Sequence, residues 1–168
     1  MLRIEPLNQA NRDAILSCDG GNGWKNNPDI WAEILQQHKA GERFVLVAME
    51  ENHAAAYGSI LWQSGYPAFA AQRIPELHDL VTAKASRHRG IATTLIAHIE
   101  AHARATGHKQ IGLGVGLYAD YGPAQRLYSA NGYALDGRGA TYRNDYAAPG
   151  ASVRMDDDLV LWMTKTLS

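Results

Sequence analysis

The segment from Ile74 to Leu117 constrains the fold of this chain more than any other feature. It holds an apolar run, IPELHDLVTA, a long amphipathic stretch, RGIATTLIAHIEAHARATG, and a second apolar run, KQIGLGVGL. The apolar residues of the middle stretch recur at helical spacing, and Gly107 stands where a helix would end. The segment therefore predicts a strand, a helix and a second strand in succession.

Other segments add strands and helices around this central unit. Strand patterns cover residues 2–7, 43–50, 54–62 and 157–167, and helical patterns cover 8–21, 27–42 and 122–132. A hairpin turn is expected over 51–53 and a long loop over 137–152. Together these patterns predict an α/β chain, with one mixed sheet and helices on its faces.

Composition limits the classes of function. Lys plus Arg (16) nearly balance Asp plus Glu (17), so the basic excess of a nucleic-acid-binding protein is absent. No apolar run approaches the roughly 20 residues that a membrane span requires. The lone cysteine, Cys18, permits no internal disulfide, which favours a cytoplasmic protein. With 168 residues and 46% hydrophobic content, we expect one domain over residues 1–168.

The start of the central helix has the composition of an anion site. Gly90 follows Arg87, His88 and Arg89, and a predicted strand lies directly upstream. Unpaired backbone N–H groups at a helix start attract phosphate, and glycine lets a ligand approach closely. The alternative is a solvated helix start that is merely basic. No Walker-type loop occurs, and the glycines of GLGVG (residues 112–116) favour a bulge or a close backbone approach.

Three short motifs in this region resemble the GNAT superfamily of acetyl-CoA-dependent N-acetyltransferases. Arg87-x-x-Gly90-x-Ala92 is similar to the R/Q-x-x-G-x-G/A signature of that family. Upstream, Glu76 precedes Leu80 by four residues, as in the central strand of many members. Downstream, AQRLYSANGY resembles the A-x-x-L-Y-x-x-x-G-F/Y element, at Ala124, Leu127, Tyr128, Gly132 and Tyr133. The resemblance covers roughly residues 75–135.

The resemblance implies a fold and a co-substrate. The expected fold is a single splayed, mostly antiparallel sheet of about six or seven strands, with pantetheine between two parallel central strands. The first of these strands would pair the pantetheine amides with the backbone of Leu80, Val81 and Thr82. The diphosphate of acetyl-CoA would lie at the helix start, on a segment made of Arg87, His88, Arg89, Gly90, Ile91, Ala92 and Thr93.

Two positions depart from the family pattern. Thr82 and Lys84 stand where the family often has Val-x-Pro before the arginine. This change is tolerable because the expected contacts there are made by backbone. Tyr121 stands where the family usually has an asparagine, three residues before Ala124. The second departure leaves open how the end of the neighbouring strand is held.

The resemblance also assigns catalytic roles. Tyr128 would act as general acid toward the departing CoA thiolate, and the alternative is a core tyrosine with a satisfied hydroxyl. Glu76 would be the base, acting through water, with His78 or water alone as alternatives. In an extended strand Glu76 and His78 share one face while Asp79 points to the other. Either residue could instead be a sheet residue without a catalytic part.

The predicted function is acetyl transfer from acetyl-CoA to an amine, by direct attack in a ternary complex. The acceptor would be a small molecule or a protein amine, with no nucleic acid or membrane involved, and the family is compatible with a homodimer. The alternative is a catalytically silent module or sensor that binds acyl-CoA. Aromatic residues near the expected acceptor pocket either line it or pack in the core: Trp24, Trp31, Trp62 and Tyr66.

No metal is expected. His98 and His102 stand four apart on the predicted helix, but Glu100 lies about 200° from His98 around the helix, unlike the metalloprotease pattern. The acidic run at 156–158 would direct consecutive side chains to alternate faces, which favours a solvated turn over an ion site.

Overall fold

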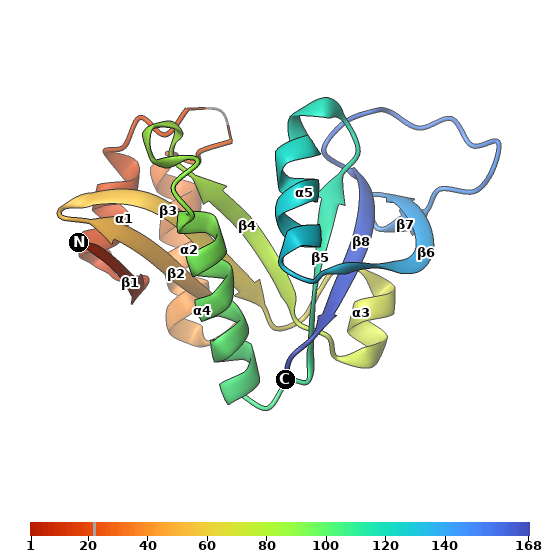
Figure 1. Ribbon diagram of the computed structural model, residues 1–168, viewed down its shortest axis with the longest axis horizontal. Helices are drawn as coiled ribbons and strands as arrows, with labels where there is room; N and C mark the ends of the chain where they lie inside the picture. The colour runs from red at the N-terminus through yellow and green to blue at the C-terminus, as the bar shows by residue number, and fades with distance from the viewer. Residues whose placement is uncertain (22) are drawn as a thin grey trace. The chain divides into compact units, whose positions relative to one another are not determined.

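The computed structural model describes residues 1–21 and 23–168, which group into two compact units. The first unit comprises residues 1–62 and 77–103, and the second comprises 63–76 and 104–168. Figure 1 shows the helices and strands of both units.

The first unit is built on a meander of strands. Its strands are β1 (Leu2–Pro6), β2 (Arg43–Glu50), β3 (His53–Leu61) and all but the first residue of β4 (Glu76–Thr82). β1 pairs with β2, and β2 with β3, both antiparallel. The helices are α1 (Gln9–Leu16), α2 (Pro28–Ala40) and α4 (Ile91–Ala105), the last of which runs on into the second unit.

Local sequence signals explain where α2 begins and ends. The Asn27 side chain accepts hydrogen bonds from the backbone N–H groups of Asp29 and Ile30, and Pro28 takes the first helical position. At the other end Gly41 has φ 76°, a left-handed conformation that glycine adopts at little cost. The helix therefore occupies the span that its pattern predicts.

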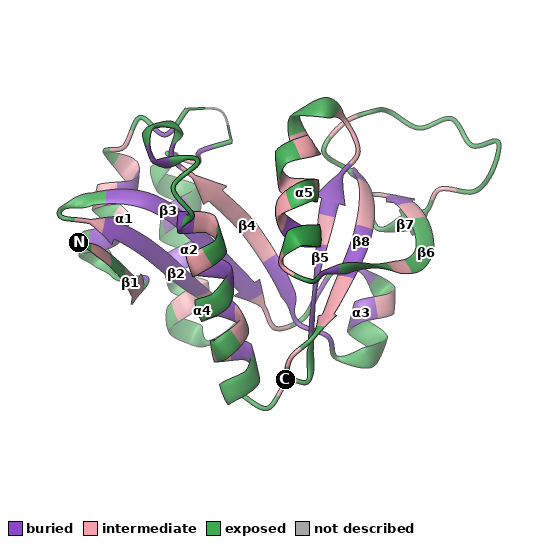
Figure 2. Ribbon diagram, in the orientation of Figure 1, coloured by how far each residue is buried: buried purple, intermediate pink, exposed green. Residues whose placement is uncertain are grey.

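Helices cover both faces of these strands. Tyr57 of β3 is buried against Trp31 of α2, with ring centroids 4.9 Å apart. The next residue, Gly58, faces the other way, and a Cβ there would lie 3.0 Å from Ile99 of α4. Figure 2 shows how thoroughly β2 and β3 are buried as a result.

The second unit contains the remaining strands and two shorter helices. Its strands are the first residue of β4, then β5 (Gln110–Gly116), β6 (Ala134–Tyr142), β7 (Asp145–Tyr146) and β8 (Leu159–Thr166). Its helices are α3 (Pro67–Gln72) and α5 (Gly122–Ala130), with 3₁₀ turns at Lys84–Ser86 in the first unit and Ala119–Tyr121 in the second. The sheet order is β1-β2-β3-β4-β5-β8-β6-β7, and β4 meets β5 in parallel through Glu76 and Gly112.

The glycines of β5 allow close packing, as the sequence predicts. A Cβ at Gly112 would lie 2.2 Å from the Phe69 ring of α3, and one at Gly116 would lie 2.4 Å from the Tyr121 ring. The Phe69 ring in turn packs edge-on against Trp162, at 5.3 Å between centroids. Replacing these glycines would force the aromatic rings away from the strand.

The predicted fold class, a mixed α/β chain with a single open sheet, is confirmed, with eight strands rather than six or seven. The expected long loop over 137–152 was partly wrong, because β6 and β7 occupy its first half. β6 contains Gly137 and Gly139 at positive φ, and its register against β8 shifts between Leu135 and Ala140. This irregularity removes the alternation that would have revealed a strand.

Candidate active site

The loop between β4 and α4 is anchored before it reaches the helix. The Ala83 N–H donates to the Ala55 carbonyl at 2.8 Å, which holds the end of β4 beside β3. The 3₁₀ turn Lys84–Ser86 follows. The Arg87 side chain then returns to the strand, where its Nε donates to the Thr82 carbonyl at 3.3 Å.

The turn into α4 leaves a row of backbone N–H groups without protein acceptors. His88 has φ 60° and Gly90 has φ 76°, and the helix begins at Ile91. The first N–H of the helix to find an acceptor is that of Thr94, which donates to the Gly90 carbonyl at 3.0 Å. No residue within the described ranges accepts a hydrogen bond from the backbone N–H groups of residues 88–93. Unpaired N–H groups at a helix start are the donors that the predicted anion site requires.

The charged side chains of this turn are already engaged. Both terminal nitrogens of Arg89 contact the Glu50 carboxylate, at 2.7 and 2.6 Å. The hydrogen bond with Glu50 raises the pKa of Arg89, and the same bond lowers the pKa of Glu50. Because Glu50 occupies the guanidinium of Arg89, the backbone N–H of Arg89 is more available to an anion than its side chain is.

A left-handed residue interrupts β4. Asp79 has φ 52°, which is rare for a residue with a side chain and unusual inside a strand. The expectation that His78 and Asp79 point to opposite faces was wrong, since His78 Nε2 lies 3.6 Å from Asp79 Oδ2. Beyond this point, Val81 packs against the core beside α2, whereas Leu80 lies on the α4 side near Gly58.

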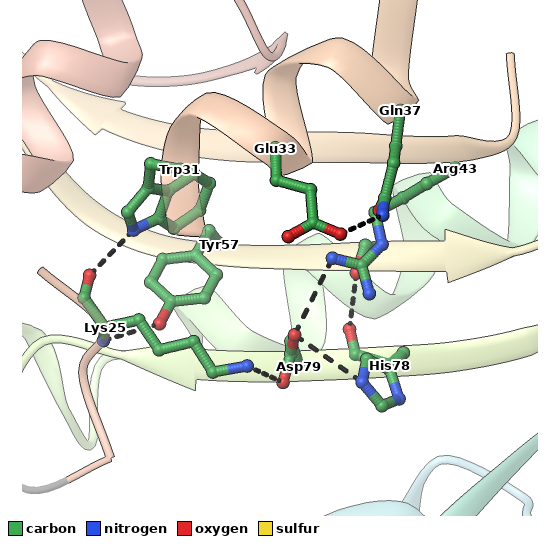
Figure 3. A network of polar contacts seen from close by, with 9 residues as sticks. Lys25, Trp31, Glu33, Gln37, Arg43, Tyr57, His78 and Asp79 are labelled. Carbon is green, nitrogen blue, oxygen red and sulfur yellow. Dashed lines mark hydrogen bonds and ion pairs between the residues drawn. The ribbon is translucent and has the colours of Figure 1, made fainter. Parts of the chain in front are cut away.

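The Asp79 carboxylate is the centre of a polar network (Figure 3). Lys25 Nζ contacts Asp79 Oδ1 at 2.7 Å, and Arg43 Nη1 lies 3.9 Å from Oδ2. Burial alone would raise the pKa of Asp79, but His78, Lys25 and Arg43 outweigh it and hold that pKa below its ordinary value. The sequence analysis missed Lys25 and Arg43, because no motif connects such distant positions.

The backbone of Lys25 is fixed on both sides. Its N–H donates to the Tyr57 hydroxyl at 2.9 Å, and its carbonyl accepts from Trp31 Nε1 at 2.8 Å. Burial raises the pKa of Tyr57, so its hydroxyl stays protonated. Trp24 packs edge-on against the same tyrosine at 4.8 Å. Of the aromatics considered for an acceptor pocket, Trp24 and Trp31 therefore pack in the core.

Glu76 is buried in the second unit, with 6% of its surface exposed. The Ser64 hydroxyl donates to Glu76 Oε2 at 2.5 Å, and the backbone N–H of Tyr66 donates to the same Ser64 oxygen at 3.0 Å. The Tyr66 ring stacks on Trp162 at 4.2 Å in the core of this unit. Glu76 thus has a fixed hydrogen-bond donor in Ser64.

Tyr128 lies on α5, also in the second unit, and is 8% exposed. Burial raises its pKa to about 12, so the phenol is protonated at neutral pH. Among the described residues, none hydrogen-bonds the Tyr128 hydroxyl. Its hydroxyl is therefore available as a donor to a bound group.

The end of β5 is held without the asparagine usual in the family. Gln125 Nε2 donates to the Gly116 carbonyl at 2.8 Å. The Tyr121 hydroxyl donates to Asp157 Oδ1 at 2.9 Å, and Tyr118 donates to the same oxygen. These bonds attach the segment after β5 to the acidic turn that precedes β8.

The first unit brings together His78 and the predicted cofactor residues, from Leu80 to Thr82 and from Arg87 to Thr93. The second unit holds Glu76 and Tyr128. The residues that the sequence did not suggest, Lys25 and Arg43, belong to the first unit with His78.

The histidine and aspartate groups considered for metal binding have other partners. His98 Nδ1 lies 2.9 Å from the Thr94 carbonyl, and His102 stacks on Phe44 at 3.6 Å between centroids. The acidic turn divides its contacts, because Asp157 binds tyrosine hydroxyls and Asp158 binds Arg143 at 3.2 Å. Within residues 1–21 and 23–168, no cluster of three or more such side chains could hold a metal ion.

Comparison with known proteins gives one family and one fold. The family model described as "Acetyltransferase (GNAT) family" matches residues 12–133. No curated protein matches the sequence. None of the described helices is long and apolar enough to cross a membrane.

Solved structures match over nearly the full length. A protein from Desulfovibrio desulfuricans, described as of the GNAT family, has TM-score 0.74 and 15% identity, with 100% of both chains covered. An aminoglycoside 6'-acetyltransferase type Ii has TM-score 0.68 and 21% identity, covering 99% of this chain and 97% of its own. An aminoglycoside 6'-N-acetyltransferase complexed with coenzyme A has TM-score 0.67 and 19% identity, with the same coverage of 99% and 97%.

Proposed function

The chain belongs to the GNAT family of acetyltransferases, and from this premise we propose that it is an acetyl-CoA-dependent N-acetyltransferase. The acceptor is a small-molecule or protein amine. The solved relatives named for aminoglycosides, which are amines, support this class of acceptor. We propose one catalytic domain over residues 1–168 that works in the cytoplasm, where its lone cysteine stays reduced.

The observation that carries the proposal is the row of unpaired backbone N–H groups from His88 to Thr93. It lies within the span that matches the family and at the start of a helix of 15 residues. We propose that these groups bind the diphosphate of coenzyme A, with the positive end of the helix dipole adding to the attraction. The backbone of Leu80 to Thr82 then holds the pantetheine amides.

Acetyl transfer requires one proton to leave and another to arrive. Acetyl-CoA supplies the activated thioester. The amine nitrogen forms a bond to the acetyl carbon as the carbon–sulfur bond breaks, and the sulfur leaves as a thiolate. An alkylammonium with a pKa of about 10.4 must first lose its proton, which costs about 4.6 kcal/mol at pH 7. The site therefore needs a base for the amine and a donor for the sulfur.

We assign the donor role to Tyr128. Its buried hydroxyl is protonated at neutral pH and makes no hydrogen bond within the described part of the chain. A thiol has an ordinary pKa of about 8.5, so a phenol with a pKa near 12 is the weaker acid. Its main contribution is therefore a hydrogen bond to the sulfur as negative charge develops, and the released thiolate takes its proton from water.

We assign the base to Glu76, acting through a water molecule. The Ser64 hydroxyl donates to one of its carboxylate oxygens and fixes the position of that oxygen. His78 remains the alternative, because its side chain is 38% exposed and lies in the same strand. Variants separate the two: Glu76→Gln should lower kcat strongly and His78→Gln only weakly if Glu76 is the base, and the reverse holds if His78 is the base. A small effect of both substitutions would favour water alone as the base.

The rival function is a module that binds acyl-CoA without turnover. Under both functions, binding of acetyl-CoA would raise the free energy of unfolding, by about 2.7 kcal/mol at a hundredfold excess over Kd. Only an enzyme releases CoA thiol when acetyl-CoA and a panel of amines are supplied together. Thiol release above the rate without amine supports the enzyme, and binding without release supports the module.

A further inference from the structure

Arg43 is a largely buried guanidinium that lacks hydrogen bonds. Its side chain is 11% exposed, and its Nε is fully enclosed without a partner. The Asp79 carboxylate is 3.9 Å away, too far for a hydrogen bond, and no other described residue accepts one from Arg43. A buried charged donor left in this state costs free energy and needs an explanation.

The neighbouring acids do not satisfy Arg43. Lys25 Nζ contacts Asp79 Oδ1 at 2.7 Å, so a single carboxylate faces both Lys25 and Arg43. Glu33 of α2 is also drawn in Figure 3, but it is exposed and accepts a hydrogen bond from Gln37 Nε2 at 3.1 Å. Solvent screens an exposed carboxylate more strongly than a buried one. Among the described residues, Asp79 is therefore the one largely buried acid beside Arg43, and it makes no hydrogen bond to the guanidinium.

Resting on the function proposed above, we infer that Arg43 and Lys25 bind a carboxylate carried by the acceptor, so that the substrates are amino acids or similar amino carboxylates. Guanidinium and carboxylate match as a planar, bidentate pair. A carboxylate on the acceptor would accept hydrogen bonds from the terminal Nη groups of Arg43, which are not enclosed as Nε is. A second ammonium group on the acceptor would instead meet both Lys25 and Arg43.

The position of the network agrees with this role. Asp79 directly precedes Leu80, the first strand residue assigned to pantetheine. Its left-handed backbone directs the carboxylate toward Lys25 and Arg43, and such strain persists in proteins chiefly at functional positions. Hydrogen bonds with Tyr57 and Trp31 fix the backbone of Lys25 and therefore the point from which its side chain extends.

Matched acceptors test the inference. Leucine is compared with isopentylamine and with leucinamide, and phenylalanine with phenethylamine, by initial rates of CoA thiol release. In the wild-type protein, kcat/KM is expected to be about 10- to 100-fold higher for each amino acid than for its matched amine without a carboxylate. This ratio corresponds to the free energy of a charge-assisted hydrogen bond. Arg43→Gln should abolish this preference, Arg43→Lys should restore part of it, and Arg3→Gln, at an exposed arginine of β1, should leave it intact.

Two results would overturn the inference: equal kcat/KM within each matched pair in the wild type, or an undiminished preference in Arg43→Gln. Circular dichroism checks that each variant is folded. If Arg43→Gln does not fold, the acceptor preference is measured in Arg43→Lys instead. If no amine yields thiol release, the proposed function fails, and binding decides the inference separately. Thermal shifts with N-acetyl-leucine and leucine that vanish in the Arg43 variant support it, and their absence in the wild type refutes it.

Discussion

At the scale of single residues, burial sets the protonation states on which the account depends. The pKa of Tyr128 is raised to about 12, which keeps the phenol neutral, and the pKa of Asp79 is held low by three basic neighbours. The catalytic role of Tyr128 was predicted from a short motif that resembles the family's pattern. Asp79 received no role from the sequence, because its left-handed backbone and distant partners leave no pattern along the chain.

Replacing Tyr128 by phenylalanine should lower kcat by about 10² to 10⁴ and leave acetyl-CoA affinity nearly unchanged. The substitution removes the hydroxyl proposed to donate to sulfur and keeps the ring that packs near Tyr133. Thiol-release kinetics and calorimetric titration measure the two quantities. Because the pKa of Tyr128 is near 12, the wild-type rate should show no fall due to this residue below about pH 10. An undiminished kcat in Tyr128→Phe would remove the residue from the mechanism.

Acidification should destabilise the protein through His38. Burial lowers the pKa of His38, and its Nδ1 accepts a hydrogen bond from the Val45 N–H at 3.1 Å, which requires that nitrogen to be unprotonated. The unfolded chain then binds a proton that the folded protein does not. Stability is therefore present above the unfolded pKa of about 6.5 and is lost as the pH falls below it.

Urea unfolding between about pH 7 and pH 5 measures this loss. His38→Gln should reduce the slope of the free energy of unfolding against pH. The substitution His53→Gln, at an exposed histidine that begins β3, should leave this slope unchanged. His102, whose pKa burial also lowers, accounts for a remaining slope. Equal slopes in the wild type and His38→Gln would show that His38 does not contribute.

At the scale of elements, the sequence predicted the parts with regular patterns and missed the irregular ones. The strand, helix and strand between Ile74 and Leu117 appear as β4, α4 and β5 because their apolar periodicity is long and clear. Helix α3 has only six residues, and β7 has two, so neither presents a full period. Anion binding at the turn before α4 remains a prediction, made from one glycine among basic residues, and the contact of Arg89 with Glu50 was not predicted.

The backbone of the β4–α4 turn should be essential for cofactor binding. Gly90 and Gly41 both have φ 76°, and a Cβ at either would meet nothing within 4 Å. Substituting leucine at either position therefore adds comparable backbone strain without a clash within the protein. We expect Gly90→Leu to abolish acetyl-CoA binding by calorimetry, while Gly41→Leu binds normally. Normal binding by Gly90→Leu would contradict the proposed phosphate site.

The packing of α3 on β5 should not tolerate a methyl group at Gly112. Its Cβ would lie 2.2 Å from the Phe69 ring, so Gly112→Ala should destabilise the protein by about 1–3 kcal/mol, as overpacking does elsewhere. Gly122→Ala is the control, because its site is open and its φ is −52°. Chemical unfolding measures both variants. Equal stabilities would mean that the ring moves aside at no cost.

At the scale of the whole molecule, the two units carry different parts of the proposed chemistry. The first holds the proposed anion-binding turn, His78 and the network around Asp79, and the second holds Glu76 and Tyr128. The family match, over residues 12–133, includes residues of both units. The sequence could predict the family and the fold class from short motifs, but it could not predict the acceptor, which depends on side chains brought together from distant segments.

Binding of the diphosphate by the backbone of residues 88–93 is the claim on which the rest depends. Amide resonances of these residues, followed by nuclear magnetic resonance during titration with coenzyme A and with pantetheine, test it most directly. We predict that coenzyme A shifts the amide signals from His88 to Thr93, and that pantetheine, which lacks the diphosphate, does not. Unmoved signals at saturating coenzyme A, or the same shifts with pantetheine, would contradict the account.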